Sequence, residues 1–145
     1  MRIVAGANRG AKIITSESRE LRPTSDRVRE SLFNILDGGR YPNPYRNKLV
    51  IDAFAGTGAL GLEAISRGAS HVIFLEQAVN SLKVLFQNIR SINAQDITTV
   101  ITGDATQFGQ PSYERAGLVM LDPPYESQMG ISCIKALKNN GWIGP

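Results

Sequence analysis

The 145-residue sequence predicts an α/β fold, a mostly parallel sheet with helices on both faces. Three observations predict it. From residue 49 onward, short runs rich in valine, isoleucine and leucine alternate with segments that have helical periodicity. These runs are apolar at consecutive positions, as in strands that are buried on both faces. A glycine-rich turn also joins the first of these runs to the first helix that follows it.

Residues 49–145 are expected to form the main domain. A first strand in KLVIDAFAG enters the glycine turn, and the helix ALGLEAISRG is expected to stop at Gly68. HVIFLE, TTVITGD and LVMLD are the second, third and fourth strands, and a last helix is expected to run to about Asn139. NSLKVLFQNIRSIN is the helix between the second and third strands. Its apolar side is expected to consist of Val79, Leu82, Phe86 and Ile89.

Residues 1–48 are expected to form an N-terminal extension of a hairpin and a helix. The apolar runs 2–5 and 11–14 flank GANRG, which predicts a β-hairpin. Pro23 precedes a helix that Thr24 or Ser25 would cap and that ends at glycines 38–39. The apolar positions of this helix are Val28, Leu32, Ile35 and Leu36. Two prolines within residues 41–47 indicate an irregular connector to the main domain.

Charge is distributed unevenly between these two parts. Residues 1–48 hold ten Lys/Arg and five Asp/Glu, a net +5, whereas residues 49–145 hold six and eight, a net −2, which together give the +3 of the chain. A basic leading segment on a mildly acidic body suggests contact with a polyanion such as nucleic acid, although it is also compatible with a solvated face.

Composition also argues against several classes of protein. No apolar run approaches the roughly 20 residues of a membrane span, and the N-terminus lacks the apolar region of a secretory signal. A single cysteine, Cys133, cannot form an internal disulfide or a zinc cluster, and it is expected to be a buried helix residue. We therefore expect a cytoplasmic protein without a metal.

The glycine turn is the first candidate site. Gly56, Gly58 and Gly61 form a G-x-G-x-x-G pattern between a strand and a helix, which is the Rossmann-like context in which backbone and helix N-terminus meet a ligand. Glu76 ends the second strand, where its carboxylate can accept hydrogen bonds from ribose hydroxyls. This pattern suits either NAD or S-adenosylmethionine.

Further residues favour S-adenosylmethionine over NAD. Asp52 lies at the strand-to-turn junction, where it would attract an amino-acid ammonium group and repel a pyrophosphate. Asp104, in TGDA, is placed to accept from an adenine amino group. The alternative interpretation is that the glycines only make a tight turn and that Asp52 caps a helix. The predicted cofactor-binding residues are Asp52, Phe54, Gly56, Gly58, Glu76, Asp104 and Ala105.

The fourth strand ends in a second candidate site, the sequence Asp-Pro-Pro-Tyr. Ligands of parallel sheets bind beyond the carboxyl ends of the strands, so Asp122 should face the same crevice as the glycine turn. The Asp122 carboxylate and the Pro123 carbonyl could accept both N–H bonds of an exocyclic amino group, and Tyr125 could stack on its base. Asp122, Pro123 and Tyr125 are therefore the predicted catalytic residues, with a rigid surface turn as the alternative.

Together these segments resemble the family of bacterial small-subunit (16S) ribosomal RNA guanine-N2 methyltransferases. The matching elements are RIVAGANRGAKI, RPTSDRVRESLFNIL, DAFAGTGALGLEA, the acid of FLE, GDA and DPPY, which together cover nearly the whole chain. The resemblance implies a class I methyltransferase fold, S-adenosylmethionine as methyl donor, and ribosomal RNA in a partly assembled small subunit as substrate. It also implies that the family's last strands are missing after residue 140, which would leave the fourth strand with an open edge.

Partners and rival functions complete the expectations. The predicted RNA-binding residues are Arg2, Arg9, Lys12, Arg22, Arg27 and Arg29. We expect a monomer without membrane contact. The alternatives are a DNA methyltransferase that modifies adenine N6 or cytosine N4, a non-catalytic RNA-binding protein that retains the cofactor pocket, and an NAD-dependent oxidoreductase.

Overall fold

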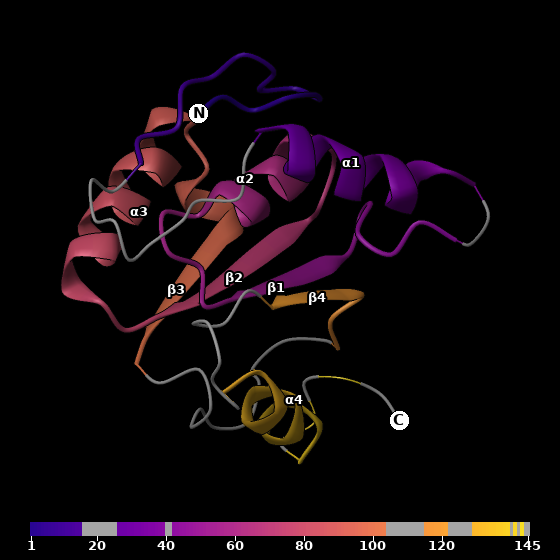
Figure 1. Ribbon diagram of the computed structural model, residues 1–145, viewed down its shortest axis with the longest axis vertical. Helices are drawn as coiled ribbons and strands as arrows, with labels where there is room; N and C mark the ends of the chain where they lie inside the picture. The colour runs from indigo at the N-terminus through magenta and orange to yellow at the C-terminus, as the bar shows by residue number, and fades with distance from the viewer. Residues whose placement is uncertain are drawn as a thin grey trace.

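A computed structural model describes residues 1–15, 26–39, 42–103, 115–121, 129–139, 141 and 143. Its centre is a four-stranded sheet in the order β3-β2-β1-β4, in which every neighbouring pair is parallel (Figure 1). The strands are β1 (Leu49–Ala53), β2 (His71–Glu76), β3 (Thr98–Thr102) and β4 (Leu118–Leu121). The predicted parallel sheet is therefore confirmed, with each strand where the apolar runs placed it.

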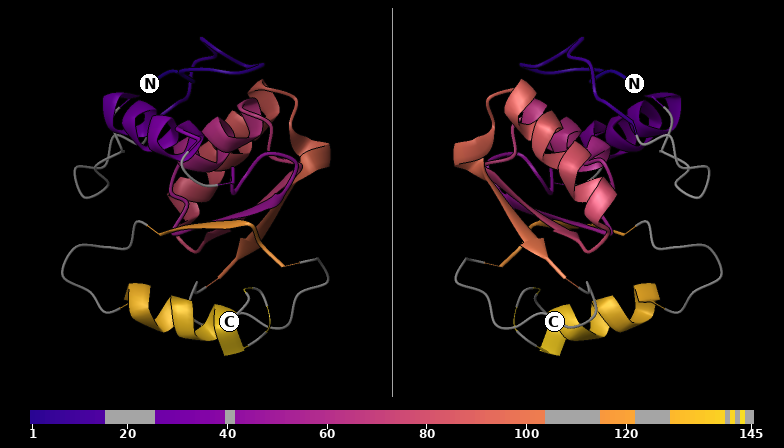
Figure 2. Two further views of the ribbon diagram at one scale, coloured as in Figure 1. Left: turned by 90° about the vertical axis from the view of Figure 1, so that its right-hand side faces the viewer. Right: turned by 90° about the vertical axis from the view of Figure 1, so that its left-hand side faces the viewer.

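Helices cover both faces of this sheet, as predicted. They are α1 (Asp26–Asp37), α2 (Ala59–Ser66), α3 (Val79–Ser91) and α4 (Met129–Asn139), with a 3₁₀ turn, η1 (Gln95–Ile97), before β3. Figures 1 and 2 show α1, α2 and α3 on one side of the sheet and α4 on the other. Each side encloses its own apolar cluster. Cys133 and Leu137 of α4, both buried, belong to the second cluster, which confirms the structural interpretation of the cysteine.

The N-terminal hairpin forms and packs on the side of α1, α2 and α3. Arg2 and Lys12 make an antiparallel bridge, and the Ile3 N–H donates to the Ala11 carbonyl (2.9 Å). No regular strand develops within residues 1–15. Ile3 and Ile13 are nevertheless almost fully buried, in the same cluster as Val50 of β1, so the hairpin and the sheet share a core.

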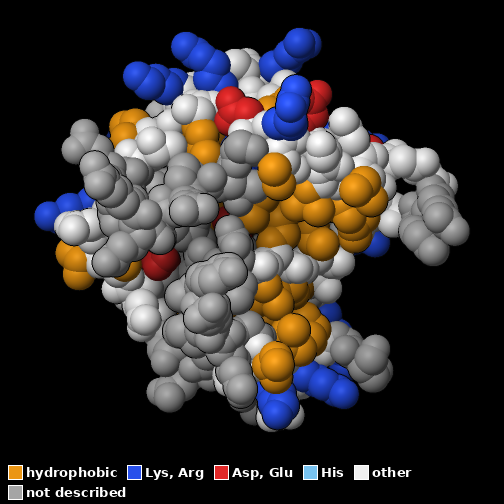
Figure 3. All heavy atoms as spheres, viewed as in Figure 1, with side chains coloured by type: hydrophobic (Ala, Val, Ile, Leu, Met, Phe, Trp, Pro, Cys, Tyr) orange, Lys and Arg blue, Asp and Glu red, His pale blue; other side chains and the backbone are white. Residues whose placement is uncertain are grey.

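The apolar face predicted for α1 is partly wrong. Val28 and Ile35 are 56% and 77% exposed, and the buried residues of this helix are Arg29 and Phe33. Phe33 packs edge-on against Tyr45, with ring centroids 5.4 Å apart. The contact of Phe33 with Tyr45 and the burial of Arg29 determine which face of α1 packs inward. Val28 and Ile35 therefore face outward, and hydrophobic side chains gather on the surface over α1 (Figure 3).

The apolar side predicted for α3 is wrong at two of its four positions. Ile89 is buried, but Val79 is 67% exposed and Phe86 is 46% exposed. Ser81 and Asn88 face the core in their place. Asn88 is buried because its side-chain amide forms hydrogen bonds with the backbone of Ile14 and Thr57. Hydrophobic periodicity cannot show that these backbone groups need a partner.

Candidate functional site

The chain makes an unusual turn where β1 enters α2. Three of its residues have a positive φ: Phe54 (57°), Gly56 (57°) and Gly58 (88°), the last being the N-cap of α2. A positive φ is uncommon for a residue with a side chain, and such strained positions concentrate at ligand sites. The turn therefore presents the N-terminus of α2 at the carboxyl edge of the sheet, where the sequence predicted the cofactor.

Glu76 connects the end of β2 to this turn. Its Oε1 accepts the N–H of Gly56 (3.1 Å) and its Oε2 accepts the N–H of Gln77 (3.2 Å). The residue is only partly buried. A carboxylate can accept up to about four hydrogen bonds, so Glu76 can hold the turn and still accept from hydroxyl groups of a ligand at the same edge.

The glycines of the turn differ in what surrounds them. A Cβ on Gly58 would lie 2.4 Å from Leu85 of α3, and one on Gly61 would lie 2.3 Å from the ring of Phe74. Both glycines allow close packing of helices and sheet. A Cβ on Gly56 would meet no described heavy atom within 4 Å, so open space adjoins the backbone here. Gly56 is the glycine beside which a ligand would fit.

Asp52 lies in β1 and is 2% exposed. Its Oδ2 accepts the N–H of Gly61 (3.0 Å), one of the first-turn donors of α2 that lack a helical acceptor. This geometry corresponds to the helix-capping interpretation. The structure does not place the Asp52 carboxylate at a ligand-accessible surface, so we assign it to holding the turn rather than to direct contact with an ammonium group.

Asn88 of α3 forms hydrogen bonds both to the glycine turn and to the N-terminal segment. This residue is 1% exposed, and its Nδ2 donates to the carbonyls of Thr57 (2.8 Å) and Ile14 (2.9 Å). Its Oδ1 accepts the N–H of Ile14 (2.8 Å). One amide thus joins the glycine turn, α3 and the second arm of the hairpin.

β4 ends at the same edge of the sheet as β1. Leu121, its last residue, is in register with Ala53, the last residue of β1. The carboxyl ends of these two strands therefore lie side by side. Asp122, Pro123 and Tyr125 themselves lie outside the described residues, as do Asp104 and Ala105. Phe54 is partly buried and packs against the cluster on the α4 side of the sheet.

Four of the predicted RNA contacts are exposed: Arg2, Arg9, Lys12 and Arg27. Lys and Arg side chains stand out at the end of the molecule that the hairpin occupies (Figure 3). Arg22 lies outside the described residues.

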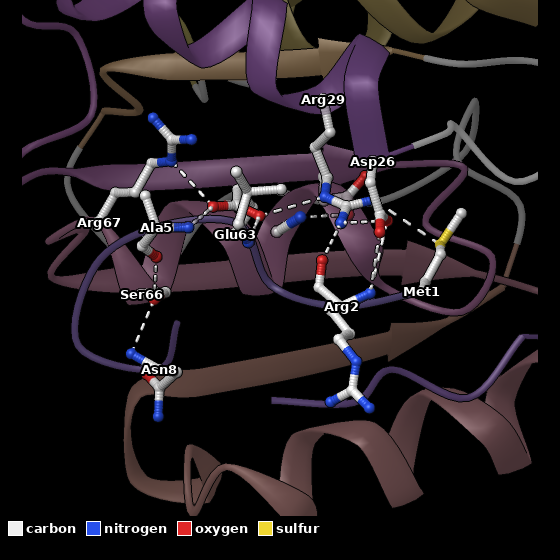
Figure 4. A network of polar contacts seen from close by, with 12 residues as sticks. Met1, Arg2, Ala5, Asn8, Asp26, Arg29, Glu63, Ser66 and Arg67 are labelled. Carbon is white, nitrogen blue, oxygen red and sulfur yellow. Dashed lines mark hydrogen bonds and ion pairs between the residues drawn. The ribbon is translucent and has the colours of Figure 1, made fainter. Parts of the chain in front are cut away.

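The assignment of Arg29 to RNA binding is wrong. Its side chain is 0% exposed and its guanidinium is occupied within the protein (Figure 4). It pairs with Glu63 (Nε–Oε1, 3.2 Å) and with Asp26 (2.9 Å), and it donates to the Arg2 carbonyl. A single sequence shows the charge of an arginine but not the buried acid that neutralises it.

Glu63 of α2 lies at the centre of a cluster with Arg29, Asp26 and Arg67, which we call the junction. It is 0% exposed, and its Oε1 accepts from the Val4 N–H (2.9 Å) and from Arg29. Its Oε2 accepts from the Ala5 N–H (3.1 Å) and from Nε of Arg67 (2.9 Å). Figure 4 shows Ala5, Arg29 and Arg67 around the Glu63 carboxylate. The junction therefore fixes the hairpin and α1 onto α2.

Sequence reasoning missed Glu63 and Asn88. The only available signal was their position inside apolar helical stretches, LGLEAI and LFQNIR, where a polar residue on the buried face needs a partner. Ser66 is a third such residue, and its Oγ donates to the Ala5 carbonyl (2.6 Å) and accepts from the Asn8 N–H (2.9 Å).

Several titratable groups of the described residues have shifted pKa values. Burial lowers the pKa of His71 at the start of β2. Burial raises the pKa of Tyr45, and the hydrogen bond from its hydroxyl to Asp37 raises it further. Burial also acts to raise the pKa of Asp26, but hydrogen bonds from Arg29 and Arg2 outweigh it and the net shift is downward.

Within the described part of the chain, no helix has the length and apolar character needed to cross a bilayer. The same residues contain no group of three or more His, Cys, Asp or Glu side chains that could hold a metal ion.

Comparisons with known proteins give a consistent result. The family profile described as conserved hypothetical protein 95 matches residues 1–145. Ribosomal RNA small subunit methyltransferase D of Haemophilus influenzae is 38% identical over 154 residues, covering 100% of this chain and 74% of that protein. The protein of the same name from Escherichia coli K12 is 35% identical over 143 residues, covering 99% and 69%.

A solved structure agrees with these sequence relatives. That of the yhhF protein from Escherichia coli has a TM-score of 0.81 and 34% identity, and the match covers 99% of this chain and 75% of that one.

Proposed function

This chain belongs to the family described as conserved hypothetical protein 95, and on that premise we propose that it transfers a methyl group from S-adenosylmethionine to the exocyclic N2 amino group of a guanine in small-subunit ribosomal RNA. Two relatives above 30% identity are named as methyltransferases of that RNA. Among the geometric observations, one carries the proposal: a partly exposed carboxylate, Glu76, holds an open glycine turn.

The described residues fit an adenosine-containing donor. Open space adjoins the backbone of Gly56, and Glu76 has acceptor capacity left at the same edge of the sheet. Glu76 would bind the ribose hydroxyls, while the backbone of Gly56 and Gly58 would adjoin the amino-acid part. From their sequence positions, Asp104 and Ala105 would contact the adenine.

The donor supplies an electrophilic methyl group on a sulfonium. The protein's contribution is to present the base amino group correctly. The Asp122 carboxylate and the Pro123 carbonyl accept its two N–H bonds, which draws the nitrogen toward tetrahedral geometry and makes its lone pair available. Tyr125 stacks on the base. The displaced proton leaves after transfer, so Asp122 need not be a strong base.

We assign RNA contact to residues 1–48 and transfer chemistry to residues 49–145. Arg2, Arg9, Lys12 and Arg27 are exposed and can meet phosphates, and Arg22 is retained on its sequence position. The substrate is the RNA within a partly assembled small subunit, and the protein acts in the cytoplasm as a monomer without a metal.

Mass spectrometry of nucleosides tests this proposal. The chain is incubated with S-adenosylmethionine labelled in the methyl group and with protein-free small-subunit RNA, assembled particles or DNA. We expect labelled N2-methylguanosine from the ribosomal samples. Labelled N6-methyladenine or N4-methylcytosine from DNA would support the rival DNA methyltransferase instead.

The variant Asp122→Ala tests the assigned chemistry. It should lower turnover at least about 100-fold, the usual range for losing a positioned acceptor, while binding of S-adenosylmethionine stays near that of the wild type. Equal turnover in the variant and the wild type would remove Asp122 from the mechanism.

A further inference from the structure

We propose that the outer face of α3 is a second RNA-binding surface, continuous with the basic hairpin, on which Phe86 stacks against an unpaired base while Lys83 and Arg90 bind phosphates. This inference rests on the proposed function, because it takes ribosomal RNA as the partner.

The three residues form one exposed stripe. Positions 83, 86 and 90 are separated by three and four residues, so their side chains lie on the same face of the helix. Phe86 is 46% exposed, and Lys83 and Arg90 are both exposed. The opposite side of α3 is the buried one. Packing of the core therefore does not account for an aromatic ring at position 86.

The charge of this surface favours a polyanion. Residues 1–15 and α3 together contain five Lys/Arg and no Asp or Glu. None of the ion pairs between described residues involves Lys83, Arg90, Arg9 or Lys12. Protein interfaces are depleted in lysine, whereas an aromatic ring among cations is the usual composition of a surface for single-stranded RNA.

Hydrogen bonds join the hairpin to α3. The Asn88 amide exchanges two hydrogen bonds with the backbone of Ile14, two residues after Lys12. Figure 2 shows the hairpin lying over one end of α3, and Figure 3 shows basic and hydrophobic side chains together at the edge of the molecule where α3 lies. An RNA strand that contacts the hairpin can continue onto α3.

Filter binding of protein-free small-subunit RNA at several salt concentrations tests the phosphate contacts. The variant K83A/R90A is compared with K135A/K138A, which removes the same charge from exposed positions of α4 on the other side of the sheet. We expect weaker binding by K83A/R90A and a slope of log affinity against log salt that is smaller by about 1.4, since each phosphate contact contributes about 0.7. Equal affinity and slope in the two double variants would overturn the proposal.

Substitutions of Phe86 test the stacking contact. F86A and F86L should each weaken binding about 5- to 150-fold, whereas F86Y should bind like the wild type, because tyrosine keeps the ring. Binding of S-adenosylmethionine and the midpoint of unfolding serve as controls, and both should be unchanged. Wild-type affinity in F86L would contradict stacking.

Two further outcomes separate this proposal from its rivals. If the α3 variants lose affinity for assembled particles but not for protein-free RNA, the surface binds a ribosomal protein and the proposal is wrong. If the wild type yields no N2-methylguanosine, the proposed function fails, while the binding data still decide whether α3 contacts RNA.

Discussion

Glu63 and Glu76 are two carboxylates on neighbouring elements, and they are used in opposite ways. Glu63 accepts four hydrogen bonds inside the junction and is fully buried. Glu76 accepts two backbone N–H groups and keeps part of its surface exposed at the carboxyl edge of the sheet. Both accept hydrogen bonds from backbone N–H groups, and we propose that only Glu76 also binds a ligand.

The difference shows how structural and functional acids can be distinguished. A buried carboxylate is tolerated where donors fill its acceptor sites, and the donors of Glu63 include two arginines. A carboxylate with remaining capacity, next to a glycine that adjoins open space, is suited to a ligand. Removing Glu63 should therefore affect stability, and removing Glu76 should affect binding.

The largest effect is expected from Glu63→Gln. The change leaves the buried guanidinium of Arg29 without its anionic partner on α2, and breaking a buried pair costs about 3–5 kcal/mol. Urea denaturation measures the free energy of unfolding, with Glu76→Gln as the matched control. Comparable losses in the two variants would erase the distinction between the two acids.

For Glu76→Ala we expect a binding defect. Hydrogen bonds to a charged group are worth about 1.5–3 kcal/mol, so the dissociation constant for S-adenosylmethionine should rise about 10- to 150-fold. Isothermal titration calorimetry provides the measurement, and the unfolding midpoint shows whether the variant remains folded. Unchanged affinity would contradict the ribose assignment.

A smaller effect is expected from reversing charge on the hairpin. The variant R9E/K12E changes exposed side chains outside the junction, so the free energy of unfolding should change little. Affinity for ribosomal RNA should fall and its salt dependence should flatten, which filter binding can detect. The matched variant K135E/K138E on α4 should retain more of the RNA affinity and more of its salt dependence than R9E/K12E. Equal losses of affinity in the two variants would indicate a nonspecific effect of net charge.

The smallest effect is expected from pH, through the only histidine of the chain. His71 lies at the start of β2, at the opposite end of the strand from Glu76, and burial lowers its pKa. The ordinary pKa of histidine is about 6.5, so near and below this pH His71 of the unfolded chain binds a proton more readily than His71 of the folded chain. The free energy of unfolding therefore falls as the pH drops from about 7 toward 5.5. Denaturation of His71→Gln should lack this component; an identical pH dependence would assign it to other groups.

The sequence singled out Glu76 as a candidate ligand-binding acid and missed Glu63, for physical reasons. Strands, helices and the glycine turn follow from local periodicity and from backbone requirements, which are written along the chain. Glu76 could be found because it ends a strand at a fixed spacing from the turn. Glu63 could not, because its donors include backbone groups 58 and 59 positions away and a side chain of another helix.

The same limit explains the errors on α1 and α3. Apolar spacing indicated that Val28 and Phe86 would be buried, but the helices are turned by buried polar residues, Arg29 and Asn88. Each of these satisfies groups distant in the sequence. Periodicity assigns a hydrophobic residue to a face without knowing which polar side chains the fold needs inside.

A crystal structure of this chain with bound S-adenosylhomocysteine would decide whether Glu76 and the glycine turn hold the methyl donor. We expect both ribose hydroxyls to donate to the Glu76 carboxylate and the amino-acid end to lie beside Gly56. A ribose bound at any other position, with Glu76 left solvated, would show that this carboxylate serves only the turn.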